Sequence, residues 1–216
     1  MQNTNMPIIT ISRQYGSGGR FIGQRLSEKL GIPFYDQALL NLAAKQSGLA
    51  SELFEHAEKA ASGLNFLLSM STHVPGLAGP PLNDQVFMIQ SDVIRHLAEQ
   101  GPCVLVGRCA DDVLRDRTDC LNVYVHASLP DRIDRAVKHY GVPREQAKII
   151  LRKMDKNRAA YYEYYTNRRW GQAENYHLSL NSDSLGIDAC VETIALVAHS
   201  FLKKTAHERA KRDFSV

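Results

Sequence analysis

The sequence predicts a single α/β domain in which a parallel sheet carries helices on both faces. Short β-branched runs alternate along the chain with longer segments that place apolar residues at helical spacing. A glycine cluster separates the first such run from the first helical segment. The 216 residues show no internal repeat and no linker, and one domain of this length can bury roughly 70 to 75% of the surface its unfolded chain exposes.

Five short runs are predicted as strands. The first and fourth are rich in Ile and Val, the third is a continuous apolar run after a Gly-Pro pair, and the second and fifth are brief. The predicted strands cover residues 7–11, 33–35, 103–106, 121–125 and 177–180. Because the connections are helical, the strands are expected to be parallel, with ligands beyond their carboxyl ends.

The helices are predicted from apolar spacing and end signals. The first ends at Gly31, the second is capped by Asp36 and ends near Gly48, and a short one starts at Ser51. The later helices are predicted from Val86 to Gly101, from Pro130 to His139, from Pro143 past Met154, and from Ile187 to Phe201. Residues 69–84 are predicted as a loop or flap, and the charged tail from Lys203 is expected to fray.

Composition excludes several classes of protein. Hydrophobic residues make up 44% and charged residues 23%, which excludes wholesale disorder, a collagen repeat and a coiled coil. The net charge of +3 does not predict a nucleic-acid partner, and no apolar run approaches the roughly 18 residues of a membrane helix. The four cysteines form no CxxC pair and no secretory leader is evident, so a cytoplasmic protein with reduced thiols is expected; the oligomeric state is left open.

The strongest motif is the glycine-rich segment that follows the first strand, IITISRQYGSGGRFIG at residues 8–23. Glycines between a strand and a helix let backbone N–H groups converge on an anion at the helix N-terminus, and phosphate is the natural ligand. A glycine turn without a ligand is the alternative. The residues predicted to contact a nucleotide are Arg13, Gly16, Ser17, Gly18, Gly19, Arg20, Phe21 and Ile22.

This segment departs from the Walker A pattern GxxxxGK[ST]. Gly19 stands where the pattern has lysine, and neither Arg20 nor Phe21 carries the hydroxyl that binds magnesium. Arg20 is predicted to replace the lysine as a permanently charged phosphate ligand, and Arg13 is a second candidate. The metal's protein ligand is unassigned.

The string ITISRQYGSGGRFIG, followed by LGIPFYD, resembles the opening of the cytidylate-kinase-like family. The resemblance implies a three-layer P-loop NTPase fold with a five-stranded parallel sheet, a helical lid at about residues 130–170 and a monophosphate-binding or flap region at about 36–85. In that family a glycine loop replaces the ordinary Walker sequence. ATP and Mg²⁺ are the implied cofactors.

The resemblance also implies roles for individual residues. Arg108, in VLVGR at 104–108, is similar to the arginine that contacts the monophosphate, and Asp155 and Arg158 match positions in the lid. Together with Arg20 these are the predicted catalytic residues, and Asp36 joins Arg108, Asp155 and Arg158 in the predicted substrate site. The alternatives are a solvated i, i+3 salt bridge for Asp155 and Arg158, and a plain helix cap for Asp36.

Other features leave their function open. Gln37 stands where the family commonly has a serine that contacts the base, so the nucleobase is not predicted with certainty. Arg132 and Arg135 open the helix after the fourth strand, where they fit either a phosphate site or an exposed helix face. Tyr161–Tyr165, with the basic residues that follow, fits helix packing better than stacking on single-stranded nucleic acid.

The leading functional hypothesis is transfer of the γ-phosphoryl group of ATP to a nucleoside monophosphate, with cytidylate as the first candidate and magnesium neutralising the phosphates. The alternative is a nucleotide-sensing protein that keeps the fold and binds nucleotide but transfers phosphate poorly. The missing lysine, the missing hydroxyl and Phe21 favour this alternative. A nucleic-acid-binding module is a third hypothesis.

Overall fold

The structure is a computed structural model that describes residues 6–46 and 82–213. Its centre is one parallel sheet with the strand order β2-β3-β1-β4-β5. The register places Ile9 opposite Val104 and Leu121, so β1 lies between β3 and β4. The prediction of a five-stranded parallel sheet is confirmed. The strands are β1 (Ile8–Arg13), β2 (Phe34–Tyr35), β3 (Val104–Val106), β4 (Cys120–His126) and β5 (Leu178–Asn181).

Helices connect the strands and follow the predicted order. The main ones are α1 (Gly19–Leu30), α2 (Gln37–Gln46), α5 (Leu82–Gln100), α7 (Leu129–Tyr140), α8 (Arg144–Thr166) and α10 (Ile187–Asp213). Three short helices follow strands or lie in turns. They are α6 (Ala110–Val113) and α9 (Ser182–Leu185), of four residues each, and the 3₁₀ helix η1 (Ala173–Asn175). They were not predicted, because one helical turn shows no periodicity.

Two predicted boundaries were wrong. Helix α5 begins at Leu82, inside the segment predicted as a loop, because the apolar spacing of this helix already starts there. Helix α10 continues through the tail to Asp213, since residues 203–213 include no Gly or Pro and are rich in good helix formers. The rest of the predicted loop and the helix predicted at Ser51 lie outside the described residues.

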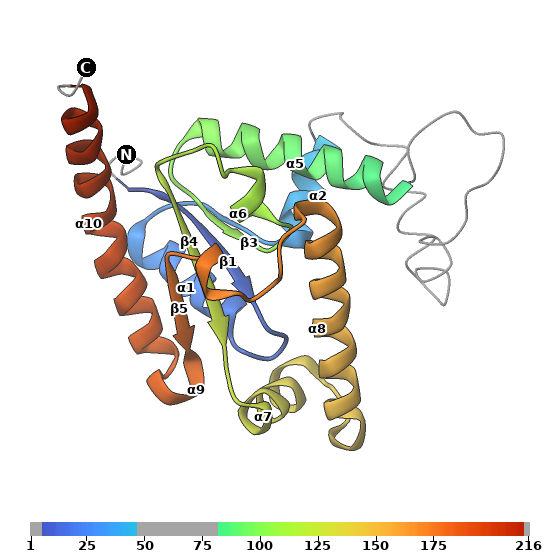
Figure 1. Cartoon of the computed structure of the whole chain (residues 1–216). Helices are drawn as coiled ribbons and strands as arrows, with labels where there is room; N and C mark the ends of the chain where they lie inside the picture. Colours follow the sequence, from blue (N-terminus) through green and yellow to red (C-terminus); the bar gives the residue numbers. More distant parts are fainter. Residues whose placement is uncertain (1–5, 47–81, 214–216) are drawn as a thin grey trace, which may run out of the picture.

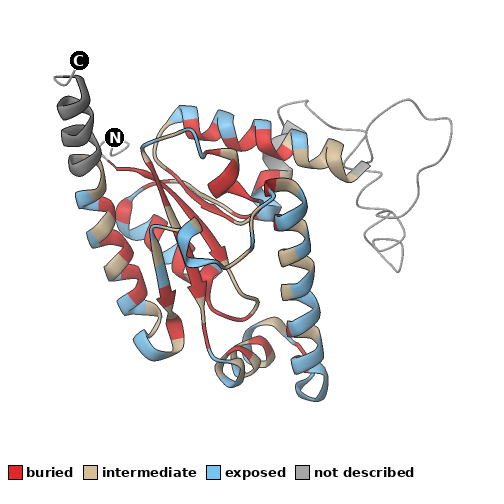
Figure 2. Cartoon of the chain, viewed as in Figure 1, coloured by how far each residue is buried: buried red, intermediate tan, exposed pale blue. Residues whose placement is uncertain are grey.

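Three layers follow from the alternation of side chains along the strands (Figure 1). On one face α1 and α10 pack against Ile9 and Ile11 of β1 and their neighbours in β3 and β4. On the other face α5, α6 and α2 pack against Ile8 and Leu105. Figure 2 shows the buried residues concentrated in the sheet and on the helix sides that face it. The strands are therefore apolar on both faces, as parallel strands between helix layers should be.

Because all strands are parallel, their carboxyl ends meet at one edge of the sheet. The β1–α1 loop lies at this edge, and α7 and the first turns of α8 lie beyond the strand tips (Figure 1). Helices α7 and α8 share a small core of their own, made of Ala136, Val142, Ala147 and Leu151, and Tyr15 of the loop packs against it. This contact fixes the helix pair to the loop.

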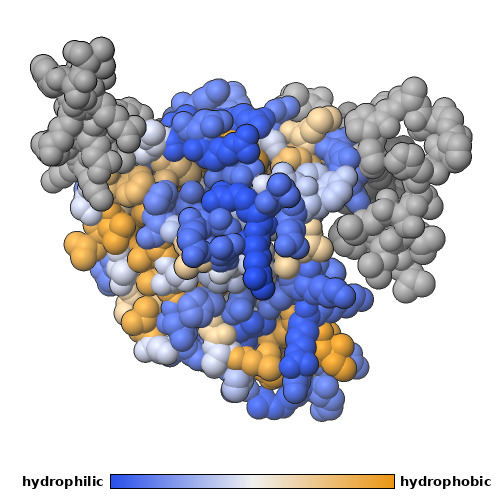
Figure 3. Space-filling model, viewed as in Figure 1, coloured by the Kyte–Doolittle hydropathy of each residue, from blue (hydrophilic) through white to orange (hydrophobic). Residues whose placement is uncertain are grey.

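The molecular surface is hydrophilic over most of the face seen in Figure 3. Hydrophobic side chains gather on the side formed by α9 and α10, where Leu185 and Leu196 are exposed. In the described part of the chain, no helix is both long and apolar enough to cross a membrane.

Candidate active site

The loop between β1 and α1 turns sharply at two glycines. Gly16 and Gly18 have φ values of +80° and +81°, a region that side chains other than glycine rarely adopt. Side chains donate hydrogen bonds to four backbone carbonyls in this segment, those of residues 13, 15, 16 and 17. Arg158 Nη1 donates to the carbonyl of residue 13 at 3.0 Å, Arg132 Nε to that of residue 15 at 2.9 Å, Arg135 Nη1 to that of residue 16 at 2.8 Å, and Ser182 Oγ to that of residue 17 at 2.5 Å.

With its carbonyls held outward, the loop turns several amides to the other side. The N–H groups of Gly16, Gly18, Gly19, Arg20 and Phe21 donate to no acceptor among the described residues. Several of them open α1, where the helix dipole adds partial positive charge. Such an arrangement of amides is suited to phosphate, and nucleotide binding at this loop stays a prediction.

Asp155 of α8 fixes the shape of the loop. Its Oδ1 accepts the Tyr15 N–H at 2.7 Å, and its Oδ2 forms an ion pair with Arg132 Nη2 at 2.5 Å. Arg158, which the sequence offered as its partner, lies 3.9 Å away. The i, i+3 pair between Asp155 and Arg158 is thus present, but it is not solvated, and the closer partner of Asp155 is Arg132. Asp155 contacts the loop backbone.

Arg13 is the last residue of β1 and does not belong to the loop itself. Among the described residues it forms no ion pair with any carboxylate. Burial, together with the charges of Arg158 and Arg108, lowers the pKa of Arg13 to about 9. The guanidinium is still protonated at neutral pH, so the site keeps a partly buried positive charge without a counter-ion.

Arg108 and Arg158 bring two more positive charges to this region. Arg108 follows β3 in a left-handed conformation with φ +57°, between Gly107 at +83° and Cys109 at +54°. This conformation costs a non-glycine residue roughly 1–2 kcal/mol, and backbone strain of this kind is concentrated at functional sites. Arg158 lies over the Tyr15 ring, and burial lowers its pKa although Asp155 opposes the shift.

Arg20 and Asp36 form an ion pair, with Nε and Oδ2 2.7 Å apart and half of the Arg20 side chain exposed. The other carboxylate oxygen of Asp36 accepts the N–H groups of Ala38 and Leu39, which confirms that Asp36 caps α2. Burial alone would raise the pKa of Asp36, but the bonds from Arg20 and the two amides outweigh it and lower the pKa. Both oxygens of this carboxylate are engaged.

The other predicted nucleotide contacts have structural tasks. Ile22 is fully buried in the core, and its N–H donates to Gly18. Ser17 is also buried; its hydroxyl donates to the Gln14 carbonyl. Phe21 packs on the end of α7, where its ring is parallel to that of Tyr140 at 6.1 Å. The side chains of these three residues therefore shape the loop from outside the phosphate cradle.

Comparison with known proteins gives one family. The sequence model described as the cytidylate kinase-like family matches residues 8–184, which is most of the chain. The chain belongs to the cytidylate kinase-like family. The predicted resemblance is thereby confirmed. No curated protein sequence matches the chain.

Solved structures share the fold of this family member. An uncharacterized protein from Eubacterium ventriosum is 24% identical with a TM-score of 0.70, over 90% of this chain and 99% of that one. The shikimate kinase from Bacteroides thetaiotaomicron is 13% identical with a TM-score of 0.54, over 89% and 98%. The shikimate kinase from Acinetobacter baumannii is 15% identical with a TM-score of 0.51, over 90% and 94%. The P-loop kinase fold is confirmed.

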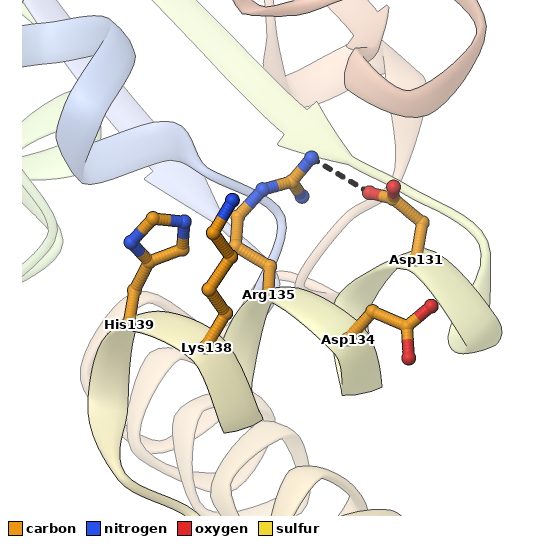
Figure 4. Close-up of a pocket in the computed structure, with 5 residues that line it drawn as sticks. All are labelled: Asp131, Asp134, Arg135, Lys138 and His139. Carbon is orange, nitrogen blue, oxygen red and sulfur yellow. Dashed lines mark ion pairs between the residues drawn. The ribbon is translucent and has the colours of Figure 1, made fainter.

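A pocket of about 230 Å³ lies beside the loop, on the exposed side of α7. It is lined by Asp131, Asp134, Arg135, Lys138 and His139 (Figure 4). Arg135 connects it to the loop, since the same guanidinium binds the Gly16 carbonyl and pairs with Asp131. Charged groups and an imidazole therefore stand next to the phosphate cradle.

The protein ligand of the predicted magnesium ion stays unassigned in the part of the chain that the structure describes. No group of three or more His, Cys, Asp or Glu side chains there could hold a metal. The two carboxylates nearest the loop, Asp36 and Asp155, already pair with arginines. Positive charge at this site comes from guanidinium groups.

Some residues of the site were not singled out from the sequence. Tyr15 and Ser182 hold the loop, and Arg132 and Arg135, left undecided there, both bind loop carbonyls. Ser182 directly follows β5, so its position at the carboxyl end of a strand was an available signal. Nothing in the sequence marked Tyr15, which contributes mainly its backbone.

Proposed function

We propose that this member of the family transfers the γ-phosphoryl group of ATP to the phosphate of a nucleoside monophosphate. The observation that carries the proposal is the group of Arg13, Arg108 and Arg158 beside a loop whose amides are free to bind phosphate. Phosphoryl transfer is catalysed mainly by positioning and by neutralising charge on the migrating group. Three guanidinium groups at a phosphate cradle supply both.

The pairing of the carboxylates favours a phosphate acceptor over a hydroxyl acceptor. A hydroxyl group must lose a proton as it attacks, which calls for a nearby base. Among the described residues, Asp36 and Asp155 each have both oxygens engaged. Asp131 and Asp134, which line the pocket on α7, are paired with Arg135 and Arg144. A phosphate oxygen is already ionised at neutral pH and needs no base.

The proposed reaction balances without a proton relay. An oxygen of the acceptor phosphate forms a bond to the γ-phosphorus, and the bond from that phosphorus to the bridging oxygen breaks. ADP leaves with the bonding pair, and a nucleoside diphosphate is formed. The loop amides hold the donor phosphates, and the pocket beside Arg135 offers space for the rest of the donor nucleotide. Cytidylate is the first acceptor to test, because the chain belongs to the cytidylate kinase-like family.

Arg158 tests the proposal against a neighbour on the same helix. With Mg·ATP as donor, Arg158→Met should lower kcat/KM for the monophosphate by about tenfold or more, since a charged hydrogen bond to phosphate contributes about 1.5–3 kcal/mol. Arg152→Met removes an exposed arginine of α8 and should leave kcat/KM unchanged. Equal losses in both variants, or a loss explained by a lower melting temperature of the Arg158 variant, would refute the assignment.

A nucleotide sensor is the second candidate. It is favoured by Phe21, which packs on α7 near the position where a Walker loop has its metal-binding hydroxyl. A sensor would show a melting temperature that rises with ATP while no acceptor is phosphorylated. Turnover that is lost on substitution of Arg158, with folding retained, would exclude it.

A further inference from the structure

The charge that a Walker A lysine would supply is carried in this chain by a different residue. Aligned with GxxxxGK[ST], Gly18 takes the place of the second glycine, so the first glycine position falls on Arg13 and the lysine position on Gly19. The chain thus has a cation where the pattern has glycine, and glycine where the pattern has the cation. From sequence alone this could be two unrelated losses.

The structure shows that the two positions share one space. A Cβ atom on Gly19 would lie 2.6 Å from Cβ and 3.0 Å from Cγ of Arg13. The Arg13 side chain therefore starts in the space that a side chain at position 19 would need. Since Gly19 has an ordinary backbone conformation, glycine is required there for room and not for its φ angle.

The far end of Arg13 reaches the loop that carries Arg108. A Cβ atom on Gly107 would lie 3.1 Å from Cζ of Arg13 and closer still to Nη1. Arg13 thus runs from the end of β1, past the first residue of α1, to the turn after β3. Its guanidinium lies against Gly107, the residue that precedes Arg108, which is expected to bind the acceptor.

We infer that Arg13 and Gly19 have exchanged the tasks of the Walker A glycine and lysine, so that Arg13 is the phosphate-binding cation of this site. Arg20, the first candidate from sequence, is held by Asp36 instead. A planar guanidinium has donors along two edges, so from this position it can bind donor and acceptor phosphates together. The inference rests on the proposed phosphate site but not on phosphoryl transfer.

Binding of inorganic tripolyphosphate, followed by calorimetry on the full chain, tests the exchange apart from turnover. Arg13→Met should weaken binding by about tenfold or more, while Arg95→Met, which removes an exposed arginine of α5, should not change it. Gly19→Ala should also weaken binding by displacing Arg13, although alanine favours the helix. Wild-type affinity in either Arg13→Met or Gly19→Ala, or no binding to the wild type at millimolar concentration, would overturn the inference.

The reverse exchange is the sharper test. Arg13→Gly should bind tripolyphosphate weakly, and the double variant Arg13→Gly, Gly19→Lys should regain at least part of the lost affinity, because it rebuilds the ordinary pattern in the vacated space. Circular dichroism and melting curves show whether each variant is folded. A folded double variant no better than Arg13→Gly would contradict the exchange. If tripolyphosphate binding depends on Arg13 but the wild type phosphorylates no acceptor, the inference stands and the proposed function is rejected.

Discussion

At the scale of single residues, the arginines of the site differ more in their partners than in their chemistry. Arg20 and Arg132 are each paired with an aspartate, whereas Arg13 and Arg108 have no carboxylate partner among the described residues. The paired arginines shape the site and the unpaired ones leave it positive. The sequence could predict that arginines gather here, but not which of them are neutralised, because the pairs Arg20–Asp36 and Arg132–Asp155 join residues that are 16 and 23 positions apart on different elements.

Asp155 is expected to support folding through Arg132. Asp155→Asn keeps an oxygen for the Tyr15 N–H but leaves the enclosed Arg132 charge without its carboxylate, so the free energy of unfolding should fall by about 2–4 kcal/mol. Asp92→Asn breaks the exposed pair with Arg95 and should change it by less than about 0.5 kcal/mol. Urea titrations measure both values. Similar small effects would show that the Asp155 pair does not hold the loop.

The left-handed backbone at Arg108 is expected to lower the stability of the protein. Its left-handed backbone suits glycine, so Arg108→Gly should be more stable than Arg108→Ala by about 1 kcal/mol, although both remove the guanidinium. Thermal or urea unfolding of the two variants gives the difference. If alanine were as stable as glycine, the strain at this turn would not be real.

At the scale of elements, the edge strand β5 is preceded by a histidine whose hydrogen bond depends on its protonation state. His177, just before β5, accepts the Asn122 N–H on Nδ1 at 2.9 Å, so the bond needs a neutral ring. Burial lowers the pKa of His177 below its ordinary value near 6.5. Between the lowered pKa of the folded state and the ordinary value near 6.5, the unfolded chain binds more protons than the folded chain. The stability that the neutral ring contributes is therefore lost as the pH falls below about 6.5.

The variant His177→Asn should retain an acceptor without the titration. The melting temperature of the wild type should drop more steeply between pH 7.5 and pH 5.5 than that of His177→Asn, and differential scanning calorimetry across this range measures the two profiles. Parallel profiles would mean that another group sets the pH dependence. His177 lies at the amino end of β5, and the proposed phosphate site lies at the carboxyl ends of the strands. Added phosphate should therefore not change the difference between the two pH profiles.

Elements with strong periodicity were predictable, and short ones were not. The apolar runs of β1, β3 and β4 and the spacing in α1, α5 and α10 gave the right sheet and layers. Helices α6 and α9 have four residues each, too few to show helical periodicity. The end of α10 lies in the charged tail, where no apolar spacing marks a helix. Boundaries set by packing or by weak propensity leave little trace in the sequence.

At the scale of the whole molecule, the fold brings the ends of β1 and β3 to one edge and places the α7–α8 pair over it (Figure 1). Residues 13, 108 and 158 therefore meet although they are far apart in sequence. The family resemblance predicted one site for Arg108 and Arg158, but it favoured Arg20 over Arg13 as the phosphate-binding cation, and Arg20 is paired with Asp36. The acceptor could not be predicted in the same way, because phosphate recognition uses a few guanidinium groups, whereas recognition of a base depends on the shape and hydrogen bonds of a whole pocket.

The assay that tests the central claim most directly is phosphoryl transfer from Mg·ATP to a panel of acceptors, with the products separated and identified. CMP, dCMP, UMP, AMP and GMP offer a phosphate oxygen, while shikimate and gluconate offer a hydroxyl. We predict that at least one monophosphate becomes a diphosphate and that neither hydroxyl acceptor is phosphorylated. Transfer only to a hydroxyl acceptor, or ATP binding without transfer to any monophosphate, would contradict the account.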